Sequence, residues 1–120
     1  MAKRILVIDD NEDILELVRM IFQEEGYDVI ISNTSETAEH ILFLGLDLIV
    51  LDVRLENPYK TGADICREFK TQHPEVKTPV ILLSAEPDLH LVASSCGADG
   101  YLSKPFDVDA LLNYVAALVA

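Results

Sequence analysis

The sequence predicts a single α/β domain in which helices cover both faces of a parallel five-stranded sheet. Three observations support this fold class. The chain has 120 residues, the length of one ordinary domain. Apolar runs of strand length alternate along it with segments of helical periodicity. Several of these runs are almost continuous Ile, Leu and Val, which is typical of strands buried on both faces.

Five segments have the length and composition expected of strands. They are predicted at residues 4–8, 28–31, 46–51, 80–83 and 100–102. The first, third and fourth are the most apolar, and we therefore expect them to be buried on both faces of the sheet. Right-handed crossover connections between parallel strands then leave few possible topologies.

The segments between and after the strands carry apolar residues at helical spacing. In the first helix they recur at i, i+3, i+4 and i+7 from Ile14, with Asp10 or Asn11 as the cap and Gly26 at the end. The other helices are expected at residues 37–44, 61–73 and 88–95, and from Asp107 onward. Gly45, Pro74 and Gly97 stand at the ends of the second, third and fourth helices.

The charge of the chain is strongly negative. It has 9 Lys and Arg against 21 Asp and Glu, a net charge of −12, with a pI near 4.4. Such a field repels nucleic acid and anionic membrane surfaces and favours cations or basic partner surfaces. We therefore expect no direct binding to nucleic acid.

The N-terminal residues and the two cysteines bear on the cellular location of the protein. MAKRILVIDD reaches carboxylates too early for the core of a signal peptide, and no apolar run approaches membrane-spanning length. Cys66 and Cys96 form no CxxC pair and are interpreted as two small core residues in a reducing compartment. These features predict a soluble cytoplasmic protein without a membrane contact.

Polar residues stand where four of the predicted strands end. The first strand is followed by Asp9 and Asp10, the third by Asp52, the fourth by Ser84 and the fifth by Lys104. In parallel α/β sheets, ligands bind beyond the carboxyl ends of the strands. We therefore expect three carboxylates, a hydroxyl and an ammonium to meet in one crevice.

The adjacent carboxylates of Asp9 and Asp10 need an explanation, because like charges repel. One interpretation is half of a Mg²⁺ site, since this ion prefers hard oxygen ligands; the other is a solvated pair at a helix start. Asp52 favours the metal site, because it emerges from the apolar run LDLIVLD at the same sheet edge. A carboxylate there can act as a nucleophile and carry a phosphoryl group. Lys104 could then bind a phosphoryl oxygen, aimed by a cis bond to Pro105.

The set IDD…LD…LSA…GADGYLSKPF resembles a bacterial response-regulator receiver domain over essentially the whole chain, residues 1–120. The resemblance implies a doubly wound, flavodoxin-like (βα)5 fold with strand order 2-1-3-4-5. By position, it implies that Asp52 is the phosphoacceptor and that Ser84 and Lys104 assist it. It also implies a Mg²⁺ site formed by Asp9, Asp10, Asp52 and the backbone carbonyl of Arg54.

The same resemblance implies partners and a switch. The phosphoryl group would come from a histidine kinase or histidine phosphotransfer protein. Ser84 would move inward and Tyr101 would follow, changing the surface of the fourth helix, fifth strand and fifth helix for a downstream protein or an output domain absent from this chain. The domain would be a signalling module that assists its own phosphorylation and dephosphorylation, not an enzyme acting on other substrates.

Two stretches depart from the pattern of the family. In DVRLENPYKTG, residues 52–62, Pro58 and Gly62 lie two positions later than usual, which lengthens the loop beside Asp52. The interval from Ser84 to Lys104 is two residues short, so the fourth helix is expected to be trimmed or its leading loop tightened. Arg54 and Glu86 occupy positions that tune dephosphorylation in the family, and their charges could pair across the mouth of the site.

Two other functions stay open at this stage. One is an interaction module with the same fold that works without phosphorylation, which the altered loops permit. The other is a phosphatase with an aspartyl nucleophile, which would need a general acid beside Asp52 and a substrate cap. The chain offers no convincing candidate for either of these parts.

Overall fold

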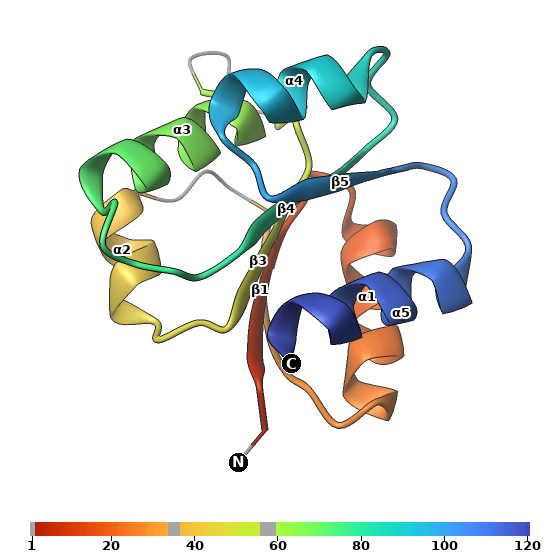
Figure 1. Cartoon of the computed structure of the whole chain (residues 1–120). Coiled ribbons are helices and arrows are strands. Elements are labelled where there is room, and N and C mark those ends of the chain that lie inside the picture. Colours follow the sequence, from red (N-terminus) through yellow and green to blue (C-terminus); the bar gives the residue numbers. More distant parts are fainter. Residues whose placement is uncertain (1, 34–36, 56–59) are drawn as a thin grey trace.

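The computed structural model describes residues 2–33, 37–55 and 60–120. Strands and helices alternate throughout, as the sequence predicts (Figure 1). The elements are β1 (Arg4–Ile8), α1 (Glu12–Glu24), β2 (Asp28–Ser32), α2 (Ala38–Phe43), β3 (Leu48–Leu51), α3 (Gly62–Gln72), β4 (Val80–Ser84), α4 (Leu89–Cys96), β5 (Gly100–Ser103) and α5 (Val108–Val119). The sheet has the order β2-β1-β3-β4-β5 with all pairs parallel, so the predicted fold class and strand order are confirmed.

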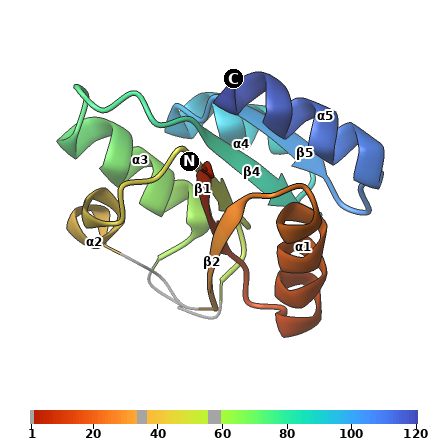
Figure 2. The ribbon, with the colours of Figure 1, turned by 90° about the horizontal axis from the view of Figure 1, so that it is seen from below.

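Helices cover the sheet in two layers (Figures 1 and 2). α1 and α5 pack on one face through a cluster that includes Phe22 and Leu111. α2, α3 and α4 pack on the other face through a cluster that includes Ile41 and Phe69. Burying one such side chain contributes roughly 1.5–3 kcal/mol, so the two clusters hold the sheet rigidly between its helices.

The central strands supply side chains to both clusters. In β1, Leu6 and Ile8 join the cluster under α2, α3 and α4, whereas Ile5 and Val7 join the one under α1 and α5. β3 and β4 are likewise buried along their whole length. The prediction that these three strands are buried on both faces is confirmed, and the residues that follow them are therefore firmly placed.

Some element boundaries differ from the sequence prediction. β3 begins at Leu48 rather than residue 46, because its ladder with β1 starts at the pair Ile5–Leu48. Asp47, just before it, instead accepts a hydrogen bond from the backbone N of Arg4 at 2.8 Å. β2, β4 and β5 each extend one residue further, to serines that still pair with the neighbouring strand.

The start of α1 decides between the two capping residues that the sequence allowed. Asn11 is the cap, because its side-chain oxygen accepts hydrogen bonds from the backbone N of Asp13 at 3.0 Å and of Ile14 at 3.2 Å. Asp10 is therefore not the cap of α1, and its carboxylate remains available for a binding site at the carboxyl edge of the sheet.

The connection to α4 is tight. Asp88, which precedes the helix, has a left-handed backbone conformation with φ of 55° and makes no side-chain capping bond. This conformation is uncommon for residues other than glycine, although aspartate adopts it more readily than most. The turn lies within the interval from Ser84 to Lys104 that the sequence analysis singles out as short. Pro58, in the lengthened loop after Asp52, lies outside the described residues.

Two further features bear on the sequence predictions. Cys66 and Cys96 are free and buried, and the Cys66 thiol donates to the backbone oxygen of Cys96 at 3.4 Å, so both are core residues as predicted. Within the described ranges, no helix combines the length and apolarity needed to cross a bilayer.

The start of α3 allows a test of pH-dependent stability. Thr61 and Asp64 cap each other, through Asp64 N to Thr61 Oγ1 at 3.1 Å and Thr61 N to Asp64 Oδ2 at 2.9 Å. The bond from the Thr61 backbone lowers the pKa of Asp64 below its ordinary value of 3.8. Its stabilising effect is thus present above that value and is lost as the pH falls through the lower folded pKa.

We expect Asp64→Ala to lower the free energy of unfolding by about 1 kcal/mol at neutral pH, measured by urea denaturation. The deficit should shrink as the pH falls below 3.8 and through the lower folded pKa of Asp64, where the wild-type side chain loses its charge. Asp64→Asn, which keeps an oxygen acceptor but no charge, should lose less at neutral pH. A deficit that is independent of pH would show that the charge of Asp64 does not contribute.

Candidate functional site

The carboxyl ends of the central strands surround one hollow of about 470 Å³. Its lining includes Asp10 after β1, Asp52 and Arg54 after β3, Ser84 and Glu86 from the end of β4 onward, and Lys104 after β5. Asp9 lies beneath them and is only 2% exposed. The structure therefore places Asp9, Asp10, Asp52, Ser84 and Lys104 together, although they are far apart in the sequence.

The register of the sheet accounts for this convergence. Ile8 of β1 lies opposite Leu51 of β3, so the next residues, Asp9 and Asp52, leave the sheet at the same level. The backbone N of Asp52 donates to the oxygen of Ile8 at 2.9 Å and fixes this alignment. On the other side, the backbone N of Lys104 donates to the oxygen of Ser84 at 2.9 Å.

Lys104 joins the two most buried carboxylates. Its Nζ donates to Asp9 Oδ2 at 2.5 Å and to Asp52 Oδ2 at 3.3 Å, and its side chain is 15% exposed. The peptide bond between Lys104 and Pro105 is cis, as the sequence suggested. The ammonium thus lies between the carboxylates that follow β1 and β3.

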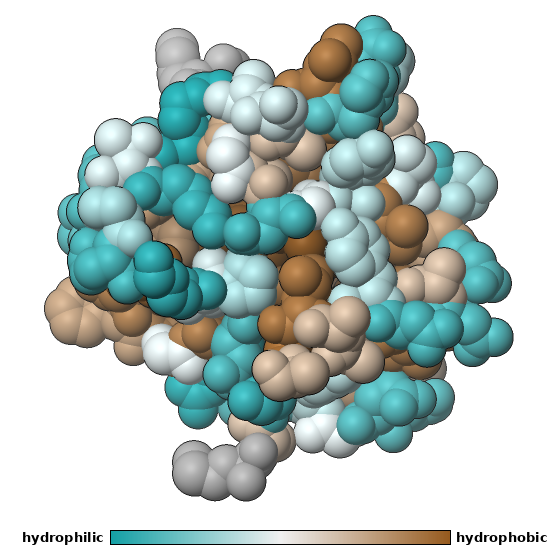
Figure 3. Space-filling view, viewed as in Figure 1, coloured by the Kyte–Doolittle hydropathy of each residue, from teal (hydrophilic) through white to brown (hydrophobic). Residues whose placement is uncertain are grey.

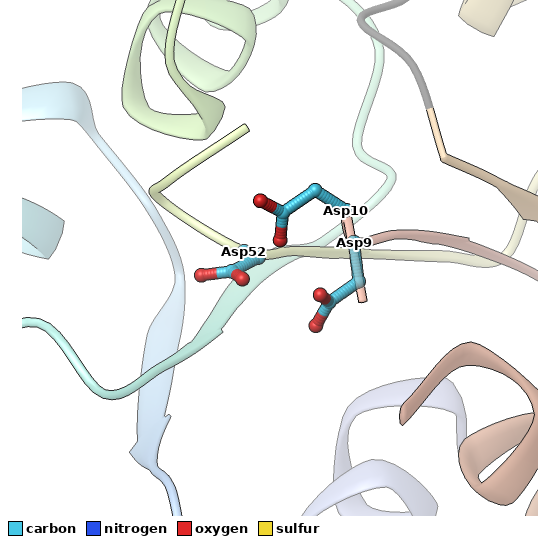
Figure 4. A group of neighbouring side chains, drawn as sticks. All are labelled: Asp9, Asp10 and Asp52. Carbon is cyan, nitrogen blue, oxygen red and sulfur yellow. The ribbon is translucent and has the colours of Figure 1, made fainter. Parts of the chain in front are cut away.

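The carboxylates outnumber the ammonium. Asp9, Asp10 and Asp52 each offer an oxygen, and these oxygens lie within 4.8 Å of one another (Figure 4). Burial is the main cause that raises the pKa of Asp9, and the nearby charge of Asp52 raises it further. Hydrogen bonds from Lys104 and from the backbone N of Asn11 lower it in part. A second cation would relieve this crowding.

This set of oxygens suits a hard divalent cation. Mg²⁺ is held in proteins by one or two carboxylates and keeps other positions for water or phosphate oxygens. Within the described part of the chain, Asp9, Asp10 and Asp52 are the only such cluster of three or more metal-binding side chains. The backbone N of Arg54 donates weakly to Asp52 Oδ1, at 3.4 Å, and the role of its carbonyl oxygen as a fourth ligand stays a prediction.

Ser84 and Glu86 also line the hollow. Ser84 is buried, and its Oγ accepts a hydrogen bond from the backbone N of Glu86 at 3.2 Å. The Glu86 carboxylate pairs with Arg54, with 2.5 Å between Nε and Oε2. The ion pair that the sequence suggested across the mouth of the site is therefore present.

Tyr101 lies away from the hollow. Its side chain is 43% exposed, and its ring is 6.5 Å from that of His90 on α4. Its backbone N donates to the hydroxyl of Tyr114 on α5 at 3.2 Å. The face that carries α4 and α5 mixes hydrophilic and hydrophobic residues (Figure 3). The structure thus shows Tyr101 in an outward position.

The sequence reasoning missed two residues that shape the site. A Cβ on Gly62 would lie 1.8 Å from the backbone oxygen of Asp52, so only glycine allows α3 to start this close to Asp52. Asn11 also holds Asp9, through its backbone N to Oδ1 at 2.9 Å. Glycine directly after the capping Thr61 was a possible signal for the first; the second follows from backbone geometry that composition does not reveal.

Comparison with known proteins agrees with this geometry. The model of the response regulator receiver domain family matches residues 5–116. The chain belongs to this family. The receiver domain is 34% identical over 119 residues to the transcriptional regulatory protein CpxR of Escherichia coli, which covers 97% of the chain and 49% of the relative. It is 35% identical over 104 residues to the response regulator SaeR of Staphylococcus aureus, over 85% of the chain and 44% of the relative.

The receiver domain thus spans about half the length of these curated relatives. Solved structures of similar size agree with its fold. The chemotaxis protein CheY4 of Vibrio cholerae has a TM-score of 0.84 at 26% identity, with 98% of this chain and 99% of that chain covered. The receiver domain of DrrB from Thermotoga maritima, in its BeF3-activated form, has a TM-score of 0.78 at 34% identity, with coverages of 99% and 98%.

Proposed function

We propose that this receiver domain accepts a phosphoryl group on Asp52 in a Mg²⁺-dependent reaction, with a histidine kinase or histidine phosphotransfer protein as the donor. The observation that carries the proposal is the position of Asp52. Its carboxylate faces a hollow together with two other carboxylates and the ammonium of Lys104, and it is 8% exposed. Asp52 lines this hollow, through which a donor can approach it.

In the proposed transfer, a carboxylate oxygen of Asp52 attacks the phosphorus of the phosphohistidine. The phosphorus–nitrogen bond breaks, and its electron pair returns to the imidazole of the donor. Asp9, Asp10, Asp52 and the carbonyl of Arg54 would hold Mg²⁺, which supplies positive charge where the phosphoryl oxygens approach. Lys104 would bind one of these oxygens, and Ser84 would donate to another after leaving the backbone of Glu86.

An apolar hollow of about 380 Å³ adjoins the site and offers a surface for the donor. It shares Ile14, Ala85 and Lys104 with the hollow above Asp52. Leu17, Pro105, Phe106 and Val108 complete its lining. Because the two hollows share these lining residues, a phosphohistidine-bearing protein that docks apolar side chains here would present its histidine close to Asp52.

The proposed output is a change of the α4-β5-α5 surface. Ser84 would move toward the phosphoryl group, and the exposed ring of Tyr101 would turn inward behind it. The partner would be a downstream protein or an output domain, because the curated relatives are about twice as long as this chain.

The net charge of −12 supports a protein partner rather than nucleic acid. We also propose a cytoplasmic location for the receiver domain.

Incubation with Mg²⁺ and radiolabelled acetyl phosphate tests the proposal. Wild type should take up label that is stable to acid and labile to base, as expected of an acyl phosphate. Asp52→Asn should remain at background, as should wild type in EDTA. Asp28→Asn, a carboxylate at the start of β2 and thus at the opposite end of the sheet, is the matched control and should label normally. Equal labelling of wild type and Asp52→Asn would reject the assignment.

A further inference from the structure

We propose that Cys66 and Cys96 form a reversible disulfide between α3 and α4 when a hydroperoxide oxidises the domain, and that this bond restrains α4. These are the only two cysteines among the 120 residues, so the disulfide has one possible pairing within the chain. Both belong to the apolar cluster under α2, α3 and α4. The formation of the bond does not depend on the phosphorylation proposed above.

The two cysteines meet across neighbouring helices. α3 and α4 lie side by side on the same face of the sheet (Figure 1), with Cys66 within α3 and Cys96 at the last position of α4. The Cys66 thiol donates to the backbone oxygen of Cys96 at 3.4 Å and also hydrogen-bonds to the Cys96 thiol. Lys70 of α3 pairs with Asp99 at 2.6 Å and holds the end of α4 beside α3. A disulfide requires the two sulfur atoms to move from this contact to about 2.0 Å.

The end of α4 allows this movement and admits the oxidant. The helix has only 8 residues, begins after Asp88 without a side-chain capping bond, and ends at Gly97 in a left-handed conformation with φ of 77°. Helix ends open locally far more often than the core of a domain. Cys96 lies at such an end and is 3% exposed, whereas Cys66 is 0% exposed. Hydrogen peroxide, which is little larger than water, therefore reaches Cys96 first.

The two thiols also differ in acidity. The hydrogen bond from Cys66 is the main cause that lowers the pKa of Cys96, although burial opposes it. The backbone N of Ala98 and the charge of Arg67 lower this pKa further. The same thiol–thiol hydrogen bond, together with burial, raises the pKa of Cys66. Because oxidants react with the thiolate, Cys96 is the sulfur that is oxidised first and Cys66 the one that closes the disulfide.

The oxidation balances with hydrogen peroxide as the co-reactant. The Cys96 thiolate attacks one peroxide oxygen, the oxygen–oxygen bond breaks, and the leaving hydroxide takes up the proton that Cys96 has lost. The Cys66 sulfur then attacks the resulting sulfenic acid, the sulfur–oxygen bond breaks, and hydroxide leaves as water with the Cys66 proton. The two thiols thus lose two electrons and two protons, and the peroxide becomes two molecules of water. A dithiol such as dithiothreitol reverses the change.

The disulfide would act on α4. The bond ties the last residue of this helix to α3, and further along the helix the ring of His90 lies 6.5 Å from that of Tyr101 on β5. Oxidation would therefore reach the α4-β5-α5 surface, and any effect on a partner there rests on the proposed function. In a reducing compartment such bonds are usually transient and respond to oxidants. The free thiols are thus the resting form of the pair.

Treatment of the folded wild-type protein with millimolar hydrogen peroxide tests the proposal. Mass spectrometry should find a monomer that has lost two hydrogen atoms, with the peptides of Cys66 and Cys96 joined, and dithiothreitol should restore the original mass. Under the same treatment, Cys66→Ala should carry a sulfenic acid on Cys96 that dimedone traps, whereas Cys96→Ala should keep a free thiol. Two free thiols in treated wild type, or disulfides only between two chains, would overturn the proposal.

A destabilised variant shows whether the bond forms in the folded state. Asp107 caps α5 on the other face of the sheet, where its carboxylate accepts from the backbone N of Ala110 at 3.0 Å. Asp107→Ala should raise the unfolded population about fivefold and still form the disulfide at the wild-type rate. A rate that rises in proportion to the unfolded population would show that the cysteines meet only in the unfolded chain, and would overturn the proposal.

Amide hydrogen exchange measures the restraint of α4. In the oxidised protein the amides of Val92 and Ala93 should exchange about tenfold more slowly than in the reduced protein, because the disulfide opposes opening of the helix end. Amides of α5 serve as the internal control and should exchange alike in both forms. Equal exchange of α4 in a protein shown to carry the disulfide would overturn the restraint. Loss of phosphoryl uptake at Asp52 would overturn the proposed function and leave this result untouched.

Discussion

Lys104→Met is expected to lower the free energy of unfolding of the metal-free protein by about 3 kcal/mol. The Lys104 ammonium contacts Asp9 at 2.5 Å and Asp52 at 3.3 Å, and Asp9 is almost fully buried. Methionine keeps much of the apolar stem but leaves the carboxylates facing one another without a cation. Urea denaturation at neutral pH in EDTA measures the effect.

Lys60→Met is the matched control for this prediction. Lys60 pairs with Glu68 at 2.7 Å and has a similarly covered side chain, 20% exposed, but its partner is 42% exposed. Its loss should cost no more than about 1 kcal/mol. Mg²⁺ should restore part of the stability of Lys104→Met, because the ion supplies the missing positive charge. Equal losses in the two variants would show that Lys104 does not balance a buried cluster.

Asp10→Asn is expected to weaken Mg²⁺ binding on the order of 100-fold, because it removes a charged ligand from the ion's oxygen set. The same change should leave the metal-free protein as stable as wild type or more stable. One of the carboxylates that lie within 4.8 Å of one another becomes neutral, which reduces their repulsion. Mg²⁺ titration followed by NMR measures the affinity, and thermal unfolding in EDTA measures the stability.

Asp13→Asn controls for the loss of an acidic residue at the start of α1, since Asp13 is exposed and lies outside the cluster. It should bind Mg²⁺ as wild type does. An unchanged affinity in Asp10→Asn would reject its role as a ligand. A wild-type protein that does not respond to millimolar Mg²⁺ would favour an interaction module that works without phosphorylation.

The order and type of the elements could be predicted because each pattern is local. Continuous apolar runs such as those of β3 and β4 need no knowledge of neighbours to be recognised as buried strands. The exact residues at which the elements begin and end were harder to predict from the sequence. Leu48 begins β3 because Ile5 faces it across the ladder, and the composition of residues 46–51 does not contain that information.

The meeting of Asp9, Asp52 and Lys104 could also be predicted, since parallel strands present their carboxyl ends at one edge of a sheet. The finer contacts of the site could not be predicted from the sequence. They depend on the register and on turns, as in the close approach of Gly62 to the backbone of Asp52 and the bond from Glu86 to Ser84. These contacts follow from tertiary geometry that no local pattern encodes.

A structure of the protein with Mg²⁺ and beryllofluoride is the most direct test of the central claim. We expect beryllium bonded to a carboxylate oxygen of Asp52, the ion held by Asp9, Asp10 and Asp52, and Lys104 Nζ in contact with a fluoride. An Asp52 side chain that carries neither group, or an ion bound away from these carboxylates, would contradict the account.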